Sequence, residues 1–583
     1  MENTEIARVL ADVSTLLEIQ GANPFRVRAY ENAARTIEEH PTPLRDLVAA
    51  GADLTELPSI GKDMASHIRE LVDTGRLTVL EELQRAIPYS LIDLVRLPGV
   101  GPKRARKLWE QLGIETLDQL ETAAQEARIE TLEGFGKKTQ ARILGGIATV
   151  RQRGSRFRLA DADQLVEPLL AHLRATADVQ QVAVAGSYRR RLETVGDIDI
   201  LAIAAQPGPV MAHFTSYPRV RKVEMSGDTR GTVILESGLQ VDLRVLPAAS
   251  YGAALQYFTG SKAHNVKLRK RAVARGLSIS EYGVFEVAEG DEGAATGGRR
   301  VSGATEEDVY AAVNLPWIPP ELREDRGEIE AAERGTLPAL LTLDDMRGDL
   351  QMHSTWSDGK QSIAEMLQGC VARGYEYFAL TDHSKNLAMT GGLDAAGVRR
   401  QWAEIAEVTA GRDDITLLRS LEIDILRDGS LDLEDEVIAE LDVVVVSVHT
   451  LLDLPAAQQT KRILTALEHP AVHVLAHPTG RLINRREPYA FDLDAVLHCA
   501  REHHVAVELN AHPHRLDLRD IHLLAARELG VPVVISTDAH QVPDLAFMRY
   551  GVEQARRAWL EPAHVLNTRP LSELRRWLAA KGI

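Results

Sequence analysis

The pattern of apolar and polar positions changes twice along this 583-residue chain. From Ile6 to Leu17, apolar residues recur at helical spacing, which predicts a helical N-terminal region. Short apolar runs at 180–185, 198–205 and 239–245 predict strands instead. From Gly348 onward, seven short apolar runs end in polar residues, mostly His, Asp or Glu, and are followed by helical patterns. Repeated β-then-α units predict a parallel barrel whose strand ends carry the active site.

Length and composition indicate a multidomain globular protein of about four units. The composition is 45% hydrophobic and 26% charged, which is typical of soluble proteins. No apolar run reaches the ~18 residues of a membrane span, and the acidic N-terminus does not resemble a secretory signal. Cys370 and Cys499 lie far apart and predict no disulfide framework. We therefore expect a reduced, cytoplasmic protein that does not bind membranes.

The net charge of −17 is unevenly distributed along the sequence. Residues 1–318 contribute about −3 and the remainder about −14. An acidic C-terminal part suits cation binding, and the nearly neutral first part remains compatible with binding to nucleic acid.

Three aspartates predict a metal site in the middle of the chain. Asp197 and Asp199 lie two residues apart on a predicted strand and therefore point to the same face. Two carboxylates crowded on one face repel each other unless a cation lies between them, and Mg²⁺ or Mn²⁺ prefers such ligands. Asp242 supplies a third carboxylate from another strand, enough for two ions. The alternative is a surface hairpin with unrelated aspartates.

Glycine-rich turns in the N-terminal region predict contacts with phosphate groups. Gly61 lies in a Leu-Pro-Ser-Ile-Gly-Lys turn, and Gly99 and Gly101 lie in a similar Leu-Pro-Gly-Val-Gly-Pro-Lys turn that ends at Lys103. Residues 132–138 form a weaker third copy. Glycines let backbone N–H groups at a helix N-terminus approach a DNA phosphate, and a nearby lysine adds charge without reading sequence. Such turns could instead simply join packed helices.

The order of these motifs resembles family X DNA polymerases. Gly-Ser-x-Arg-Arg, Gly-Asp-x-Asp and a later Asp resemble their nucleotidyltransferase palm, and Tyr257 to Ser261 match their nucleotide-binding turn. The resemblance implies that Asp197, Asp199 and Asp242 are catalytic. The residues implied to bind the nucleotide are Ser187, Arg190, Gly196, Tyr257, Phe258, Gly260, Asn265 and Arg269.

Two positions depart from the family pattern in the polymerase part. Val195 replaces a serine found in several relatives and so removes one possible phosphate donor. The position aligned with the Schiff-base lysine of some relatives is His67, and an imidazole cannot form the usual amine adduct with a sugar aldehyde. We therefore expect deoxyribose-phosphate lyase activity to be weak or absent.

The C-terminal motifs resemble the PHP (polymerase and histidinol phosphatase) domain, a distorted (β/α)7 barrel. The resemblance implies a cluster of two or three Zn²⁺ or Mn²⁺ ions. Its expected ligands are His353, Asp358, His383, Glu422, His449, His477, Asp538 and His540. Gln351 replaces a usual histidine and is a poorer ligand. The alternative is a structural barrel without activity.

The sequence thus predicts an all-α helix-hairpin-helix region, an α+β palm and thumb, and an α/β barrel. The expected domains are 1–80 and 81–154 (helix-hairpin-helix), 155–247 (palm), 248–318 (thumb), 319–345 (linker) and 346–583 (PHP). We expect a monomer that fills short gaps in DNA with dNTPs and trims 3′ ends or abasic sites. The alternatives are a nucleotidyltransferase acting on RNA or a small molecule, a repair nuclease, and a DNA-binding scaffold in which one metal domain is inactive.

Overall fold

The computed structural model forms two compact units, Met1–Arg156 and Phe157–Ile583. It describes residues 3–38, 44–95, 97, 99–132, 134–136, 139–140, 142–147, 156–176, 178–287, 298–387 and 390–581. Within these ranges, no helix is both long enough and apolar enough to cross a membrane.

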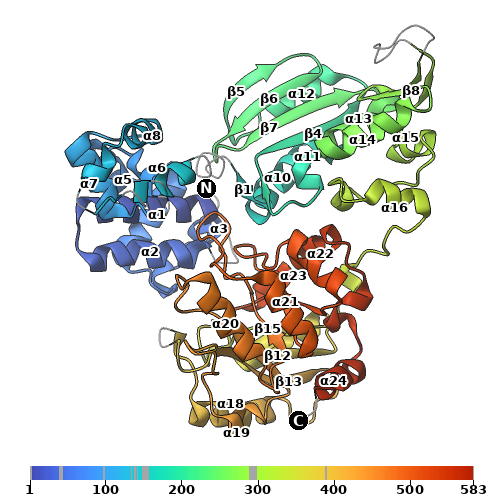
Figure 1. Ribbon diagram of the computed structural model, residues 1–583. Helices are drawn as coiled ribbons and strands as arrows, with labels where there is room; N and C mark the ends of the chain where they lie inside the picture. Colours follow the sequence, from blue (N-terminus) through green and yellow to red (C-terminus); the bar gives the residue numbers. More distant parts are fainter. Residues whose placement is uncertain are drawn as a thin grey trace. The chain divides into compact units, whose positions relative to one another are not determined.

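The first unit is entirely helical in its described part (Figure 1). Its apolar residues form one core, which includes Leu10, Leu17, Ile68 and Leu108. The helices are α1 (Asn3–Gln20), α2 (Pro24–Glu38), α3 (Leu44–Ala49), α4 (Lys62–Thr74), α5 (Thr78–Ala86), α6 (Leu91–Val95), α7 (Pro102–Leu112) and α8 (Leu117–Gln125), with short 3₁₀ turns at Leu54–Glu56 and Ile129–Thr131.

The second unit begins with a palm built on a five-stranded sheet of order β2-β4-β7-β6-β5. Helices α10 and α12 cover one face, where Ile198 and Leu243 are buried, and α13 packs against the other, where Leu201 is buried. The palm elements are β1 (Phe157–Arg158), α10 (Leu159–Arg174), β2 (Val179–Val184), α11 (Gly186–Arg189), β3 (Thr194–Val195), β4 (Asp197–Ala204), α12 (Pro207–Thr215), β5 (Val220–Ser226), β6 (Arg230–Leu235) and β7 (Gln240–Leu246).

The thumb follows and packs around Leu268, Val309 and Tyr310. The segment predicted as a linker is partly helical, and its Leu322 and Ile329 belong to the same core. The elements are α13 (Tyr251–Thr259), α14 (Lys262–Val273), β8 (Leu277–Ser280), β9 (Gly283–Glu286), β10 (Arg300–Ser302), α15 (Glu306–Ala312) and α16 (Glu328–Arg334), with 3₁₀ turns at Ala248–Ser250, Pro320–Leu322 and Leu343–Asp345.

The rest of the chain forms a seven-stranded parallel sheet in sequential order, β11 to β17. A bridge between Met352 and Ala539 links the segments that follow the first and last strands, so the barrel is nearly closed. The strands are β11 (Gly348–Asp349), β12 (Tyr377–Leu380), β13 (Thr416–Asp424), β14 (Val443–Ser447), β15 (Val474–Leu475), β16 (Ala506–Asn510) and β17 (Val533–Ser536). These strands confirm the predicted barrel class.

Helices surround the barrel strands (Figure 1). The barrel interior is filled by small and branched side chains such as Ala379, Val445 and Val534, and Leu574 and Leu578 of the C-terminal helix pack against them. The helices are α17 (Ile363–Ala372), α18 (Ala395–Val408), α19 (Asp435–Ile438), α20 (Ala456–Leu467), α21 (Leu493–Glu502), α22 (Asp520–Leu529), α23 (Met548–Arg557) and α24 (Leu571–Ala579), with 3₁₀ turns at Val542–Phe547, Pro562–His564 and Leu566–Thr568.

Candidate active sites

The three palm aspartates lie on one face of the sheet. Strands β4 and β7 pair in parallel, and their register places Asp199 opposite Asp242 and Asp197 opposite Gln240. Because Ile198 and Val241 point into the core on the other face, the aspartates face the side on which α13 packs. Thr232 and Gln240 donate hydrogen bonds to the two carboxylate oxygens of Asp242, the second at 2.9 Å. The register therefore puts the three predicted aspartates on one face of the sheet.

The electrostatics of this face favour a cation. Burial, and then the charges of Asp197 and Asp242, raise the pKa of Asp199 to about 6. The described residues place groups of three or more ligand atoms within 4.8 Å of one another only in the barrel, so the palm carboxylates are spread more widely than that. An all-oxygen donor set with repelling carboxylates fits Mg²⁺ or Mn²⁺.

The turn between β2 and β4 carries Ser187 on the short helix α11 and Gly196 immediately before β4. Gly186 has a φ of +65°, and a Cβ at this position would lie 2.9 Å from Oδ2 of Asp199. Only glycine therefore allows the turn to approach the aspartates this closely. Arg190 donates from Nη1 to the carbonyl of Thr259 at 2.5 Å and pairs through Nε with Glu324 at 3.0 Å.

The second predicted nucleotide-binding segment joins α13 and α14. Tyr257 and Phe258 lie in the last turn of α13, and Gly260 follows it with a φ of +68°. Asn265 donates to the carbonyl of Tyr257 at 2.7 Å and accepts from Gln256 at 2.7 Å, so its amide braces the turn. Arg269 lies one helical turn further along α14 and donates to the carbonyl of Asn265 at 3.3 Å. Arg190, which directly follows α11, thus connects the palm turn to this second segment through the carbonyl of Thr259.

The N-terminal glycines lie at the starts of helices, as the hairpin motif requires. Gly61 is the N-cap of α4 and Gly101 is the N-cap of α7. Residues two positions earlier, Ser59 and Gly99, both have left-handed φ angles, of +62° and +86°. The two turns therefore share one backbone shape that leaves helix N-terminal N–H groups available to an anion. Lys103 lies in the first turn of α7.

Some hairpin residues lie outside the described part of the chain, namely Pro98, Glu133, Lys137 and Lys138. The third copy keeps a left-handed glycine, Gly134, with a φ of +90°. His67 lies on α4, with its Nδ1 atom 3.2 Å from the Tyr30 hydroxyl.

Glu422 is the centre of the barrel site and is 1% exposed. Its Oε1 atom lies 2.8 Å from Nε2 of His477 and 3.3 Å from Nε2 of His449. Its Oε2 atom lies 3.4 Å from Nδ1 of His383 and 3.5 Å from Nε2 of His353. One carboxylate at the end of β13 thus contacts histidines that follow four different strands.

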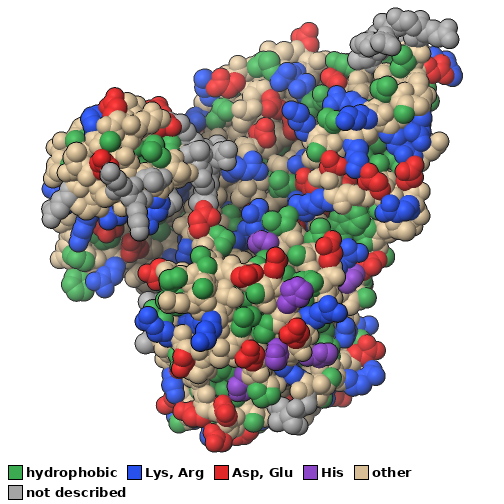
Figure 2. All heavy atoms as spheres, viewed as in Figure 1, with side chains coloured by type: hydrophobic (Ala, Val, Ile, Leu, Met, Phe, Trp, Pro, Cys, Tyr) green, Lys and Arg blue, Asp and Glu red, His purple; other side chains and the backbone are tan. Residues whose placement is uncertain are grey.

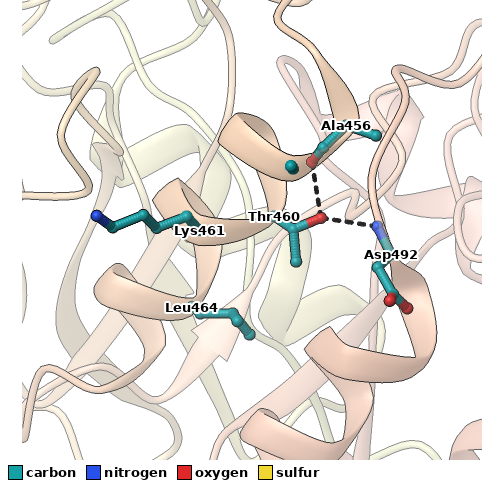
Figure 3. A pocket seen from close by; sticks show the side chains of 6 residues that line it. Ala456, Thr460, Lys461, Leu464 and Asp492 are labelled. Atoms are coloured by element: carbon teal, nitrogen blue, oxygen red, sulfur yellow. Dashed lines mark hydrogen bonds between the residues drawn. The ribbon is translucent and has the colours of Figure 1, made fainter.

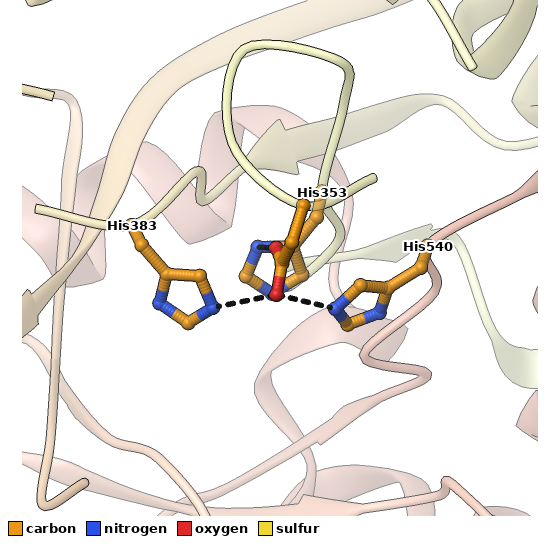
Figure 4. Close-up of side chains that lie close together, drawn as sticks. His353, His383 and His540 are labelled. Carbon is orange, nitrogen blue, oxygen red and sulfur yellow. Dashed lines mark ion pairs between the residues drawn. The ribbon is translucent and has the colours of Figure 1, made fainter. Parts of the chain in front are cut away.

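A second carboxylate, Asp358, extends the site to the other side. Its Oδ2 atom lies 3.5 Å from Nε2 of both His383 and His540, and Figure 4 shows these two rings pointing towards it from opposite sides. Asp538 contacts Nε2 of His353 at 3.1 Å. The structure therefore brings all eight predicted barrel residues into one cluster.

The donor set of the barrel fits a cluster of divalent ions. Ligand atoms lie within 4.8 Å of one another in two groups that share His383, and the members are His353, Asp358, His383 and His540 in one, and His383, Glu422 and His449 in the other. Burial lowers the pKa of His383, but Glu422 and Asp358 outweigh it and raise the pKa to about 9. Burial lowers the pKa of His540 as well, but Asp358 and Asp538 outweigh it and raise the pKa to about 10. His477 faces this set through its Nε2 atom, and its buried Nδ1 atom has no hydrogen-bond partner among the described residues.

Several residues around the cluster were not singled out from the sequence. Asp424 accepts from Nδ1 of His449 at 2.6 Å, and Asn510 donates to Asp538 at 3.0 Å. Arg515 lies 3.4 Å from the other side of Asp538. Asp424 follows Glu422 by two residues on the same strand, so strand alternation could have found it. Arg515 lies on a loop, where no local periodicity marks it.

Four other polar residues, two near the barrel cluster and two in ion pairs, have contacts of their own in the structure. Glu508 accepts the backbone N–H of His477 at 2.6 Å, and Gln351 is buried with neither amide atom hydrogen-bonded. Arg481 pairs with Glu193 of the palm at 2.7 Å, and Arg158 pairs with Asp161 at 2.7 Å. Gln351 therefore remains available beside the cluster, whereas both arginines are held in ion pairs.

Other surface features carry less information. Lys and Arg side chains gather over the thumb in the face shown in Figure 2. Among the thumb helices, α14 carries Lys267 and Arg271. Both are paired with carboxylates, Lys267 with Glu330 at 2.6 Å and Arg271 with Glu333 at 3.0 Å.

A cavity of about 430 Å³ lies between α20 and α21, where the Thr460 hydroxyl accepts a hydrogen bond from the backbone N–H of Asp492 (Figure 3). None of its lining residues belongs to either cluster.

The fold and the two clusters define a nucleotidyltransferase joined to a metal-binding β/α barrel. Family models match the helix-hairpin-helix domain at residues 1–77, a SAM-like helix-hairpin-helix tandem at 91–147 and the DNA polymerase beta thumb at 254–324. The chain is 39% identical over 580 residues to the DNA polymerase/3′-5′ exonuclease PolX of Bacillus subtilis (strain 168), and the match covers 99% of each chain.

More distant relatives match only part of the chain. DNA polymerase lambda of Arabidopsis thaliana is 26% identical over 324 residues, which is 51% of this chain and 57% of the relative. DNA polymerase lambda of Rattus norvegicus is 24% identical over 345 residues, or 55% and 56%. The chain belongs to the bacterial family X DNA polymerases with a C-terminal PHP domain. The predicted family is thereby confirmed.

Proposed function

We propose that this chain is a DNA polymerase that fills short gaps during DNA repair and trims 3′ ends with its barrel. The observation that carries the polymerase assignment is the register of β4 and β7, which sets Asp199 beside Asp242 with Asp197 on the same face. The relative that matches the whole chain is named as both a DNA polymerase and a 3′-5′ exonuclease.

In the palm, Asp197, Asp199 and Asp242 would hold two Mg²⁺ or Mn²⁺ ions, which lower the pKa of the attacking primer hydroxyl and stabilise the leaving pyrophosphate. Thr232 and Gln240 orient Asp242 for this task. The primer 3′-hydroxyl attacks the α-phosphorus of the dNTP, the bond to the β-phosphate oxygen breaks, and pyrophosphate leaves.

The nucleotide-binding residues surround this position. Ser187, Arg190 and Gly196 supply a hydroxyl, a guanidinium and a backbone N–H to the triphosphate. Tyr257, Phe258 and Gly260 form the turn beside the sugar and base, and Asn265 and Arg269 follow on α14. In the first unit, Gly61, Gly99, Gly101 and Lys103 bind phosphates of the DNA that flanks the gap.

In the barrel, the eight clustered residues would hold two or three Zn²⁺ or Mn²⁺ ions, which activate water for attack on a phosphodiester. His353, His383 and His540 contribute neutral imidazoles, while Glu422, Asp358 and Asp538 balance the charge. Asp424 holds His449 through its Nδ1 atom and so fixes the ring that faces Glu422. The products are a nucleotide and a shortened strand with a free 3′-hydroxyl. We further propose that the protein acts as a monomer in the cytoplasm.

One assay on the wild-type protein tests this function. DNA with a labelled primer and a one-nucleotide gap is incubated with Mn²⁺, with and without dNTPs. We expect extension by one nucleotide with dNTPs and stepwise shortening of the primer without them, and both must stop with EDTA. Shortening without extension would identify a nuclease instead, and neither activity would identify a scaffold.

A further inference from the structure

A helix of the barrel holds the segment that follows the nucleotide-binding turn of the palm. Gln554 of α23 donates from Nε2 to the carbonyl of Arg191 at 2.8 Å. Arg557, three residues later on the same helix face, donates from Nη1 to the carbonyl of Arg190 at 2.6 Å. Gln554 is 1% exposed and Arg557 is 4% exposed, so both bonds are shielded from water.

The same arginine also reaches the side chain of Arg190 through a shared carboxylate. Glu324 Oε1 accepts from Nη1 of Arg557 at 3.0 Å and from Nε of Arg190 at 3.0 Å. The second nitrogen of Arg557 donates to Asp520 at 2.7 Å, which fixes the plane of its guanidinium. The position of the Arg190 guanidinium therefore depends on a residue of the barrel.

Two residues that precede Gln554 on α23 also bind the palm. Glu553 pairs with Arg191, which also lies 3.5 Å from Asp163 of the palm. Tyr550 is buried in the palm core and donates to Asp163 at 2.9 Å. The helix thus packs in the barrel core through Met548, Val552 and Ala555 and reaches the palm core through Tyr550.

We propose that α23 is a positioning element for the incoming nucleotide: Gln554 and Arg557 fix the carbonyls of Arg191 and Arg190 and thereby aim Ser187 and Arg190 at the nucleotide phosphates. The inference rests on the proposed polymerase function. Sites that bind a transition state need their groups held to within about half an ångström, and buried hydrogen bonds to the backbone provide such support.

Substitutions on α23 test the role of each bond. Gln554→Met removes the donor at similar volume, and Gln554→Glu replaces the donor with an acceptor facing a carbonyl. Arg557→Met removes all three bonds of the guanidinium, whereas Arg557→Lys keeps a charged donor. Arg556→Met is the matched control, because Arg556 lies on the same helix but binds Glu321 and the carbonyl of Leu341.

The measurements are kcat and KM for dNTP in one-nucleotide gap filling, and trimming of single-stranded DNA without dNTPs. We expect Gln554→Met to raise KM about 2- to 10-fold, the net effect of one buried hydrogen bond. Gln554→Glu raises KM further, kcat changes less than KM, and trimming stays at the wild-type rate. Arg557→Lys has a smaller effect than Arg557→Met, and Arg556→Met leaves KM unchanged.

Three results would overturn the inference. A wild-type KM in Gln554→Met and Gln554→Glu would show that the turn keeps its shape without α23. An equal loss of filling, trimming and thermal stability in both Gln554 variants would show that α23 supports the fold alone. If Asp199→Asn fills gaps as well as the wild type, the proposed polymerase function fails first, and the inference falls with it.

Discussion

Asp199 carries the clearest electrostatic sign of a cation site in the palm. Burial and the charges of Asp197 and Asp242 raise its pKa to about 6. At neutral pH, its ionised form therefore lowers the free energy of unfolding. Perturbed carboxylates that face one another are typical of functional sites, because a structural role would be served better by a neutral side chain. The raised pKa of Asp199 therefore supports the proposal that this residue binds a cation.

The first prediction follows from this raised pKa. Asp199→Asn removes one repelling charge and should raise the free energy of unfolding by about 1–2 kcal/mol at pH 7.5 in EDTA. The same change removes a ligand, so Mg²⁺ should no longer raise the melting temperature of the palm, and gap filling should fall at least about 1,000-fold. Thermal unfolding with and without Mg²⁺ measures both effects, with the exposed Asp228→Asn as control. A variant that is destabilised in EDTA would contradict the electrostatic account.

The second prediction concerns the barrel. Glu422 contacts four histidines, so Glu422→Gln should remove at least one of the bound ions and lower the trimming rate at least about 100-fold. Asp424→Asn disturbs only the orientation of His449 and should weaken metal affinity about 10- to 100-fold. Metal content after dialysis, measured by mass spectrometry, tests both, with the exposed Glu434→Gln as control. Wild-type metal content in Glu422→Gln would contradict the assignment.

At the scale of elements, ion pairs between helices hold the palm turn against the thumb. Glu306 of α15 accepts two hydrogen bonds from Arg189, at 2.8 and 2.7 Å, and one from Arg323 at 2.6 Å. Burial raises the pKa of Glu306, but these two arginines outweigh it and lower the pKa to about 2. The carboxylate therefore stabilises the fold only while it is ionised.

The third prediction is the pH dependence of this contribution. Because the folded-state pKa of Glu306 is below its unfolded value, its stabilisation is complete above about pH 5 and is lost as the pH falls towards about 2. Glu306→Gln should lower the free energy of unfolding by about 2–3 kcal/mol at pH 7, and the difference should shrink below pH 4.5. Urea unfolding from pH 7 to pH 3 measures it, with the exposed Glu307→Gln as control. If the difference in free energy of unfolding between Glu306→Gln and the wild type grew on acidification, the predicted direction of the pH dependence would be wrong.

The fourth prediction concerns the helix-hairpin-helix elements. Lys103 lies in the first turn of α7, next to the N-terminal N–H groups that Gly101 leaves open. Lys103→Ala should weaken binding of gapped DNA and reduce the slope of log K against log salt by about 0.9, the effect of one phosphate contact. Titrations at several salt concentrations measure the slope. Lys461→Ala, on the barrel surface, should leave the slope unchanged, and an equal change in both variants would indicate nonspecific charge.

Across the whole molecule, the structural features that depend on local periodicity could be predicted from the sequence. The strands of the palm and barrel, and the aspartates and histidines at their ends, follow from alternation and from polar residues that terminate apolar runs. The backbone carbonyls that Gln554 and Arg557 bind do not follow from any local pattern, because they lie more than 300 residues away in the sequence. The packing of the 319–345 segment into the thumb core likewise could not be predicted, because the segment is polar and charged in composition.

The barrel part and the rest of the chain also differ in net charge. The barrel part holds most of the net negative charge, and its histidine and carboxylate cluster is largely buried. In the palm, the charges of Arg244 and Arg230 act on Asp199 and lower its pKa, against the larger effects of burial and of the other two aspartates. We infer that the two reactions are separate in their catalytic residues, and that α23 of the barrel positions only the nucleotide site of the palm.

We propose that one chain fills gaps in DNA and trims 3′ ends with two independent metal sites. The most direct measurement uses gapped DNA with a mismatched, labelled primer terminus, Mn²⁺ and all dNTPs. Wild type should first shorten the primer and then extend it, Asp199→Asn should accumulate only shortened primer, and Glu422→Gln should extend without removing the mismatch. If Asp199→Asn still extends the primer, or if Glu422→Gln still shortens it, the division of labour between palm and barrel is wrong.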